Sequence, residues 1–388
     1  MPRNPNDILA YRKKSKRKSR IYKFIAVFMV IFIIFFIWTN GTAVFEPFRD
    51  IARYFNKSES EEGFPIAVSG SASFSLNRFG QNFLLLNDTY LNTYTDKGGQ
   101  LLAFRHNYAN PVQRVTNKRI LLYNFNSYEF SLFNRNSRIY EIKLDEKIVL
   151  AELGNNDMAA VVTSSTAFSN ILHIYDDDGK WRYTKRFIDE EVNAVTFTSK
   201  SNEIIVVTVS ARNGEIISKA YRLRTDTATD DIVWEQTLPA DALALNVYEN
   251  KNYINILADN MIISLNSSDG EIAGSYQFND GNLLKPPVFS ADFNLIILND
   301  YITKRALYVT LDEQCNLISS KMIPFEVKKV EISSEIVYTL SGSAIIRHDK
   351  FLQETNATAI EDEYRDFIIL NKNALLLGYE AIEQIAVN

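Results

Sequence analysis

The sequence predicts an all-β protein built from repeated units, and two observations support this prediction. From about residue 64 onward, short runs rich in Val, Ile, Leu, Phe and Tyr alternate with clusters of Asn, Asp, Gly and Ser, as in strands joined by tight turns. The gaps between successive polar turns are 40, 42, 48, 43, 43 and 37 residues, a mean of about 42. These turns, in which an Asp or Asn follows an apolar or aromatic residue, are marked by Asp96, Asn136, Asp178, Asp226, Asp269, Asp312 and Asp349.

A period of 40–45 residues with four short strands per unit is typical of a β-propeller blade. Seven marked turns, plus one unit shared between the two ends of the repeat region, predict about eight four-stranded blades. In the shared unit, Phe367–Asn388 supplies three strands and Pro65–Val68 supplies the fourth, which closes the ring and removes two free sheet edges. Seven blades are the alternative if the 48-residue gap contains an insertion around Thr225–Asp231.

The first 63 residues have a different character. Residues 1–20 form a basic arm, and residues 1–23 together contain nine Lys or Arg and one Asp, which leaves a net charge of −13 on the rest of the chain. An uncharged apolar segment follows, and residues 21–42 are predicted to form a transmembrane helix, since 24–45 as helix would span about 33 Å. The excess of positive charge on one side predicts a cytoplasmic N-terminus.

Residues 43–63 are predicted to form a juxtamembrane amphipathic helix and a hinge. Apolar residues recur there at spacings of three and four, and a Ser- and Glu-rich stretch follows them. The domain prediction is therefore a cytoplasmic arm (1–20), a transmembrane helix (21–42), this segment (43–63) and an extracytoplasmic propeller (64–388). Because the basic run ends at an apolar segment, it is interpreted as a signal for membrane orientation, and no nucleic-acid partner is expected.

Features that could support chemistry are few, and the sequence assigns no catalytic, cofactor-binding or metal-binding residue. Asp176–Trp181 partly resembles a calcium loop and the Asp-box of some propellers, but it lacks the closing Glu of the first and the Trp spacing of the second. Three acidic clusters could supply carboxylate pairs, and they are expected to be solvated loops at blade junctions. The three clusters are Asp189–Glu191, Asp230–Asp231 and Glu361–Glu363.

Histidine and cysteine are too scarce to suggest a metal centre. His106, His173 and His348 occur singly, without metal-ligand spacing, and Cys315 is the one cysteine of the chain. Each is expected to be a structural residue of a strand or turn. With a single cysteine, an internal disulfide is excluded.

The repeats lack the Trp-Asp dipeptide of WD40 blades, and Gly98-Gly99 is the only Gly-Gly pair, which argues against a kelch array. In texture they resemble the degenerate quinoprotein-like, WD40-like and surface-layer-type repeats of exported bacterial propellers. Over about residues 20–388 the chain resembles an uncharacterised family of membrane-anchored proteins from Clostridia-like bacteria, a domain of unknown function. This resemblance rests on layout and blade texture, and it implies no activity.

These observations favour a membrane-anchored, extracytoplasmic propeller that binds or scaffolds a cell-envelope protein or a cell-wall polymer. An acidic propeller favours basic partners. One alternative is a glycan-active hydrolase or lyase whose carboxylates converge at the mouth of the propeller channel, at the separation that glycoside hydrolysis requires. A second alternative is a ligand sensor whose basic arm contacts a cytoplasmic partner.

Overall fold

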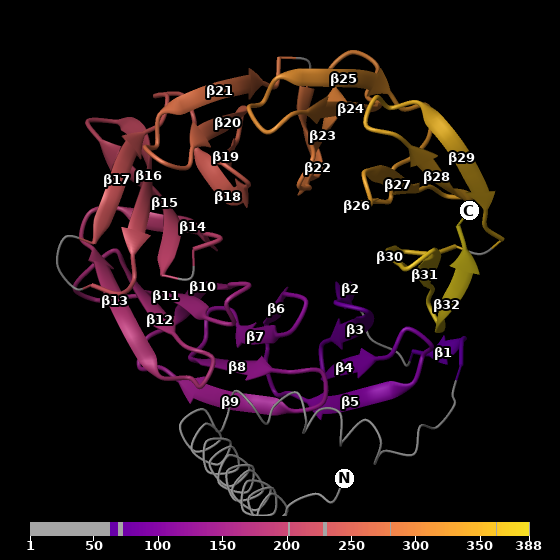
Figure 1. The fold of residues 1–388 in the computed structure, drawn as a ribbon, viewed down its shortest axis with the longest axis horizontal. Helices are drawn as coiled ribbons and strands as arrows, with labels where there is room; N and C mark the ends of the chain where they lie inside the picture. The colour runs from indigo at the N-terminus through magenta and orange to yellow at the C-terminus, as the bar shows by residue number, and fades with distance from the viewer. Residues whose placement is uncertain are drawn as a thin grey trace, which may run out of the picture. The chain divides into compact units, whose positions relative to one another are not determined.

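The computed structural model describes residues 63–68, 73–200, 202–227, 231–279, 281–361 and 363–387. These residues belong to one compact unit and form 32 strands in eight four-stranded antiparallel sheets. The sheets are arranged as a ring with one strand of each sheet facing the centre, which is the β-propeller fold (Figure 1). The prediction of eight four-stranded blades is confirmed, and the seven-blade alternative is wrong.

The blades follow one another along the chain. Blade 1 is β2 (Phe74–Phe79), β3 (Asn82–Asn87), β4 (Tyr90–Tyr94) and β5 (Gln100–Arg105), and blade 2 is β6 (Pro111–Val115), β7 (Ile120–Asn124), β8 (Glu129–Phe133) and β9 (Arg138–Lys143). Blade 3 is β10 (Ile148–Leu153), β11 (Ala159–Ser164), β12 (Asn170–Tyr175) and β13 (Trp181–Phe187), and blade 4 is β14 (Glu191–Phe197), β15 (Glu203–Arg212), β16 (Glu215–Arg224) and β17 (Ile232–Thr237).

The second half of the ring repeats this order. Blade 5 is β18 (Ala244–Asn250), β19 (Tyr253–Ala258), β20 (Met261–Asn266) and β21 (Ile272–Gln277), and blade 6 is β22 (Gly281–Phe289), β23 (Asn294–Asp300), β24 (Ala306–Leu311) and β25 (Leu317–Met322). Blade 7 is β26 (Lys329–Ser333), β27 (Ile336–Leu340), β28 (Ala344–His348) and β29 (Glu354–Ala359), and blade 8 is β30 (Asp366–Leu370), β31 (Asn373–Leu377), β32 (Ala381–Ala386) and β1 (Ile66–Ala67).

Blade 8 joins the two ends of the described chain. Strand β1 pairs antiparallel with β32, with Ile66 opposite Ile382 and Ala67 opposite Ala381. The pairing is extended by Val68, whose N–H donates to Glu380 O at 2.7 Å. The N-terminal run Pro65–Val68 therefore provides the outer strand of the last sheet, and the ring is closed by backbone hydrogen bonds.

The core consists of eight hydrophobic clusters, and each lies between two neighbouring blades. The second strand of a blade is packed on both of its faces, so it is a continuous apolar run, as in β7 (Ile120–Asn124), where every residue is buried. The cluster between blades 8 and 1 places Leu375 with Phe83, and Ile66 packs against it. Closure thus buries apolar surface in addition to pairing β1.

All seven marker turns fall between the third and fourth strands of a blade. In the turn after β24, Asp312 Oδ1 accepts the N–H groups of Gln314 at 2.9 Å and Asn316 at 2.8 Å. The turn after β28 repeats this geometry, with Asp349 accepting from Phe351 at 2.9 Å and Gln353 at 2.8 Å. In these two turns the marker Asp is therefore a turn cap, whereas in the turn after β8 the cap is Asn134, two residues before the marker Asn136.

The 48-residue gap has a different cause from the one proposed in the sequence analysis. The extra residues lie mainly in the hairpin of β15 and β16, which are ten residues each, rather than in an insertion at Thr225–Asp231. Asn213 and Gly214 form its two-residue tip with φ of 54° and 85°, as a type I′ turn requires. The hairpin lengthens blade 4 without changing the number of blades.

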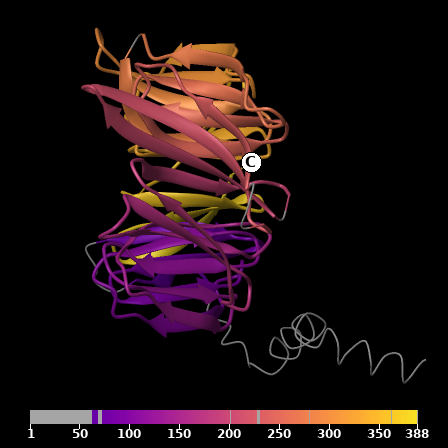
Figure 2. The same cartoon turned by 90° about the vertical axis from the view of Figure 1, so that its left-hand side faces the viewer.

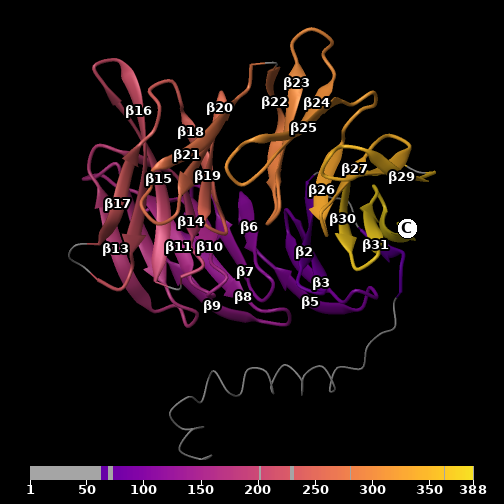
Figure 3. The same cartoon turned by 45° about the horizontal axis from the view of Figure 1, so that its top comes forward.

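The ring has two faces. The hairpin face contains the turns between second and third strands and the connections from one blade to the next, and it includes the tips Arg212–Glu215 and Asp300–Arg305. The Asp-turn face contains the marker turns and the turns between first and second strands. Figure 2 shows the sheets edge-on, and Figure 3 shows hairpins β15–β16 and β23–β24 extending on one side of the ring.

The predicted arm, transmembrane helix and juxtamembrane helix fall in residues 1–62, outside the described residues, and they stay predictions. In the part of the chain that the structure describes, no helix is long and apolar enough to span a bilayer.

Candidate functional site

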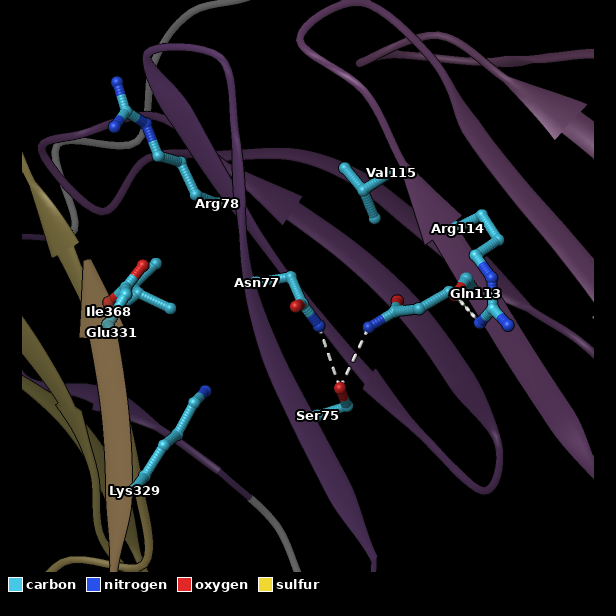
Figure 4. A pocket seen from close by; sticks show the side chains of 9 residues that line it. All are labelled: Ser75, Asn77, Arg78, Gln113, Arg114, Val115, Lys329, Glu331 and Ile368. Atoms are coloured by element: carbon cyan, nitrogen blue, oxygen red, sulfur yellow. Dashed lines mark hydrogen bonds between the residues drawn. The ribbon is translucent and has the colours of Figure 1, made fainter. Parts of the chain in front are cut away.

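The innermost strands of blades 7, 8, 1 and 2 surround a cavity of about 500 Å³ on the channel side of the ring. We call this cavity the channel pocket. Figure 4 shows side chains of β2 and β6 on one wall and side chains of β26 and β30 on the other. Its lining residues are Ser75, Asn77, Arg78, Gln113, Arg114, Val115, Lys329, Glu331 and Ile368.

Three neutral polar side chains meet at one wall of the channel pocket. Asn77 Nδ2 donates to Ser75 Oγ at 2.8 Å, and Gln113 Nε2 donates to the same oxygen at 3.0 Å (Figure 4). Ser75 Oγ therefore accepts twice, and its own O–H remains available as a donor. Gln113 Oε1 is buried and has no hydrogen-bond partner.

The cations of the channel pocket differ in how they are paired. Lys329 forms an ion pair with Asp366, and Arg114 Nε lies 2.9 Å from Glu152 Oε2. Arg78 is exposed, and its Nε donates to Gly80 O at 3.0 Å. Among the residues that the structure describes, no carboxylate forms an ion pair with Arg78.

Glu331 is the carboxylate of the channel-pocket lining. Burial raises the pKa of its carboxyl group to about 7, against the opposing effects of the nearby Lys329 and Arg78 charges and of the Ile369 N–H. That N–H donates to Glu331 Oε2 at 2.6 Å and links blades 7 and 8. Near neutral pH, Glu331 is therefore partly protonated.

The nearby Asp366 has both carboxylate oxygens engaged, with partners in blades 7, 8 and 1. Besides its pair with Lys329, its Oδ2 accepts the N–H of Leu76 at 3.1 Å, and its Oδ1 accepts the N–H of Phe367 at 2.8 Å. The channel-pocket lining thus contains one carboxylate, Glu331, and does not present the two free carboxylates that a glycosidase mechanism uses. The lining offers a cation, a hydroxyl donor and amide oxygens, which suits binding.

A second cavity, of about 420 Å³, lies beside blades 3 and 4 and is called the outer cleft. Glu190 there accepts from Thr208 Oγ1 at 2.8 Å and lies 3.1 Å from Lys219 Nζ. Although burial acts in the opposite direction, hydrogen bonds from Thr208, Tyr221 and Lys219 hold the pKa of Glu190 below its usual value. Lys219 Nζ also lies 2.7 Å from Glu235 Oε1, so these three charges of the cleft are paired with one another.

The structure does not bring the three predicted acidic clusters together. Glu190 belongs to the outer cleft. Asp231 was expected in a connection between blades, but it lies in the turn between β16 and β17 of blade 4, where its Oδ1 is 2.9 Å from Lys185 Nζ. Glu363 precedes β30, and its Oε1 lies 3.1 Å from Lys328 Nζ. Asp230 and Asp362 fall outside the described residues.

The remaining sequence candidates have structural positions. Asp176 Oδ1 accepts the N–H groups of Asp178 at 3.1 Å and Lys180 at 2.8 Å, as a turn cap. Cys315 is buried in the turn that Asp312 caps, with φ of 64°, and burial raises the pKa of its thiol to about 12. In the described ranges, no group of three or more His, Cys, Asp or Glu is placed to hold a metal ion.

Burial explains the behaviour of the three histidines. His106 and His348 are buried, His173 is partly buried, and burial lowers the pKa of each imidazole. His106 Nε2 lies 2.9 Å from Asn87 O, and His173 Nδ1 lies 3.1 Å from Thr184 Oγ1.

Sequence reasoning missed the exposed apolar residues of the hairpin face. Ile302, at the β23–β24 tip, is 91% exposed, and Tyr301 beside it is 49% exposed. Ile216, at the β15–β16 tip, is 47% exposed, and Ile188, in the connection to blade 4, is 72% exposed. The Asn213-Gly214 pair was a usable signal, because Asn-Gly between strands indicates a two-residue hairpin.

The fold and the channel-side cavity define the described chain as an eight-bladed β-propeller. The chain belongs to DUF5711, a family of unknown function whose model matches residues 52–386. No curated protein matches the sequence.

Solved structures similar to this chain are propellers with little sequence identity. BamB from Moraxella catarrhalis has a TM-score of 0.55 at 7% identity, over 82% of this chain and 100% of that one. The C-terminal WD40 domain of Sif2 has a TM-score of 0.58 at 8% identity, over 83% of this chain and 97% of that one. The WD40 domain of SCAP from fission yeast has a TM-score of 0.54 at 6% identity, over 84% of this chain and 96% of that one. At these identities the likeness concerns the fold alone.

Proposed function

We propose that this protein is a membrane-anchored binding module that holds its propeller outside the cytoplasmic membrane and captures another cell-envelope protein on the hairpin face. The observation that carries the proposal is the exposure of apolar side chains at two hairpin tips of this face, at Ile216 in the long β15–β16 hairpin and at Tyr301–Ile302 in the β23–β24 hairpin. Ile302 is the most exposed large apolar side chain of the described residues, and burying such a side chain against a partner releases about 25 cal/mol per Å².

Charge supports a partner of particular chemistry. The chain after residue 23 has a net charge of −13, so an acidic propeller attracts proteins with a basic surface. The similarity to BamB and to WD40 domains supports a scaffold architecture and names no partner for this chain.

The membrane location rests on the sequence. An apolar segment follows nine basic residues, and this order favours an N-terminal anchor with a cytoplasmic arm. The propeller then lies outside the cytoplasmic membrane, where a cell-envelope partner can reach the hairpin face.

The capture experiment compares two pairs of exposed apolar residues on opposite faces. Full-length tagged protein is purified from native membranes as wild type, as Tyr301→Ser/Ile302→Ser on the hairpin face, and as Leu317→Ser/Phe351→Ser on the Asp-turn face, where both residues are more than half exposed. We expect a specific partner with wild type and with the Asp-turn variant, and its loss with the hairpin variant. Failure to recover a specific partner under several growth conditions, or equal loss from both variants, contradicts the proposal.

The location is tested by labelling intact cells with a membrane-impermeant thiol reagent. Cys315 is 3% exposed, so it contributes little background, and Phe351→Cys adds an exposed thiol to the propeller. We expect labelling of the Phe351→Cys protein in intact cells. Labelling only after the membrane is permeabilised places the propeller in the cytoplasm and contradicts the proposed location.

A further inference from the structure

We propose that the channel pocket binds an anionic sugar, meaning a polyhydroxylated ring that carries a carboxylate or a phosphate, with Arg78 holding the anionic group and Ser75, Asn77 and Gln113 holding the hydroxyl groups. This site is independent of the proposed capture of a protein, because it uses inner strands of the ring rather than the hairpin face. The argument rests on three properties of the channel pocket.

The first property is an available cation. Lys329 and Arg114 are neutralised by Asp366 and Glu152, whereas Arg78 forms no ion pair with the described carboxylates. Its guanidinium uses Nε on Gly80 O, at 3.0 Å, which leaves the two terminal nitrogens as donors. A guanidinium with two free parallel donors is matched to a carboxylate or phosphate group.

The second property is a set of unused neutral groups. Gln113 Oε1 is buried without a partner, and leaving such an acceptor unpaired is unfavourable. Asn77 Oδ1 has no hydrogen-bond partner among the described residues, and Ser75 has a free O–H because its oxygen accepts from Asn77 and Gln113. Two amide oxygens beside a hydroxyl donor complement sugar hydroxyls, which both donate and accept.

The third property is space. A volume of about 500 Å³ lies within the usual size of small-molecule sites and accommodates a sugar ring with its charged substituent. The apolar side chains of Val115 and Ile368 complete the lining and offer contact for the carbon face of the ring. The walls come from four blades, so the site exists only in the closed ring.

Glu331 makes binding depend on pH. The charged groups that act on it are Lys329 on its own strand β26, Asp366 on β30 and Arg78 on β2, while β27 places the neutral Tyr338 opposite it. When Glu331 ionises, its charge competes with the ligand for Arg78. Affinity for an anion therefore falls as pH rises through about 7. If only the protonated form binds, the fall between pH 6 and pH 8 is about tenfold.

The binding test uses the full-length protein in detergent and isothermal titration with D-glucuronate, whose charge is constant between pH 6 and pH 8. We expect glucuronate to bind about tenfold more weakly at pH 8, and uncharged glucose not to bind. Glucose 6-phosphate and inorganic phosphate, both at pH 6, distinguish the sources of the anion. Binding of either charged sugar supports the proposal, whereas equal affinity for glucose, equal affinity for inorganic phosphate, or no binding by either charged sugar overturns it.

Three variants test which residues bind the charged sugar and which residue causes the pH dependence of binding. Arg78→Gln is expected to weaken binding of the charged sugar by about tenfold or more, because it removes charge-assisted hydrogen bonds. Arg105→Gln, another exposed arginine of blade 1 that lies outside the pocket lining, is the matched control and is expected to bind like wild type. Glu331→Gln is expected to bind equally at pH 6 and pH 8. Circular dichroism verifies the fold of each variant, and unchanged binding by Arg78→Gln overturns the proposal.

Discussion

The two faces of the ring use their turns in different ways. On the Asp-turn face, the side chains of Asp176, Asp312 and Asp349 are consumed in capping their own turns, so the same residue type recurs at nearly constant spacing. On the hairpin face, the β15–β16 hairpin is longer than the others, and its tip and the β23–β24 tip carry exposed apolar residues, with Ile302 at 91% exposure. The comparison teaches that the recurring polar turns of this chain build the fold, whereas the tips of individual hairpins, which differ from blade to blade, present exposed apolar surface.

The largest predicted effect concerns a buried ion pair on the Asp-turn face. Arg222 is 4% exposed and pairs with Glu203, and its Nη1 also donates to Ser267 Oγ at 2.9 Å. Glu203→Ala leaves a buried charge unpaired and is expected to lower the free energy of unfolding by about 3–5 kcal/mol in urea denaturation. Lys200→Ala, which removes an exposed partner of the same Glu203, is the control and is expected to cost less than about 1 kcal/mol. Equal costs would show that this face does not depend on internal pairing.

The inner strands belong to neither face, and the pH dependence of stability tests the position assigned to Glu331 on one of them. Burial raises the pKa of Glu331 to about 7 from an ordinary 4.5, so between these values the folded protein holds a proton that the unfolded chain releases. The free energy of unfolding of the wild type, relative to that of Glu331→Gln, therefore falls by on the order of 1–3 kcal/mol as pH rises from 4.5 to 7. Above pH 7 this difference stays constant. The difference between the two unfolding free energies, followed from pH 4.5 to 8, checks this. A difference independent of pH contradicts the position assigned to Glu331.

A single cap on the Asp-turn face has a moderate predicted effect. Asp312→Ala removes the acceptor for two backbone N–H groups, at 2.9 and 2.8 Å, and is expected to cost about 1 kcal/mol in urea denaturation. Asp312→Asn keeps an acceptor oxygen and is expected to retain most of the stability. If the alanine and asparagine variants are equally destabilised, the charge and not the cap is what matters there.

The smallest predicted effect on stability belongs to the hairpin face. Ile302→Ser is expected to change the free energy of unfolding by less than about 0.5 kcal/mol, because a side chain that is 91% exposed gains little from folding. Thermal denaturation of the full-length protein measures this. A large loss of stability would show that Ile302 packs within the propeller, and the contrast between the two faces would then disappear.

The repeat could be predicted from the sequence because turn residues and apolar runs, which are local in sequence, determine it. The marker turns recur every 37–48 residues because a polar turn joins the third strand to the outer strand in each of the first seven blades. The apolar runs such as Ile120–Tyr123 reflect strands packed on both sides. The location of the extra residues in blade 4 was predicted wrongly, because the gap gives a length and not a place. The Asn213-Gly214 tip, with both residues at positive φ, indicates the true place.

The channel pocket could not be predicted in the same way. Ser75 and Gln113 lie 38 residues apart, and Asp366 reaches Leu76 across 290 residues of sequence. These contacts exist only because the ring closes, and no local spacing encodes which inner strands become neighbours. The raised pKa of Glu331 likewise depends on burial, which outweighs the opposing effects of the Lys329 and Arg78 charges.

The central claim, that the hairpin face is the capture surface, is tested most directly by site-specific photo-crosslinking in native membranes. A benzophenone side chain replaces Ile302 on the hairpin face or Phe351 on the Asp-turn face, two exposed apolar positions. The account predicts one discrete crosslinked species of higher mass from position 302 and none from position 351. A discrete species from position 351 with none from position 302 would contradict it.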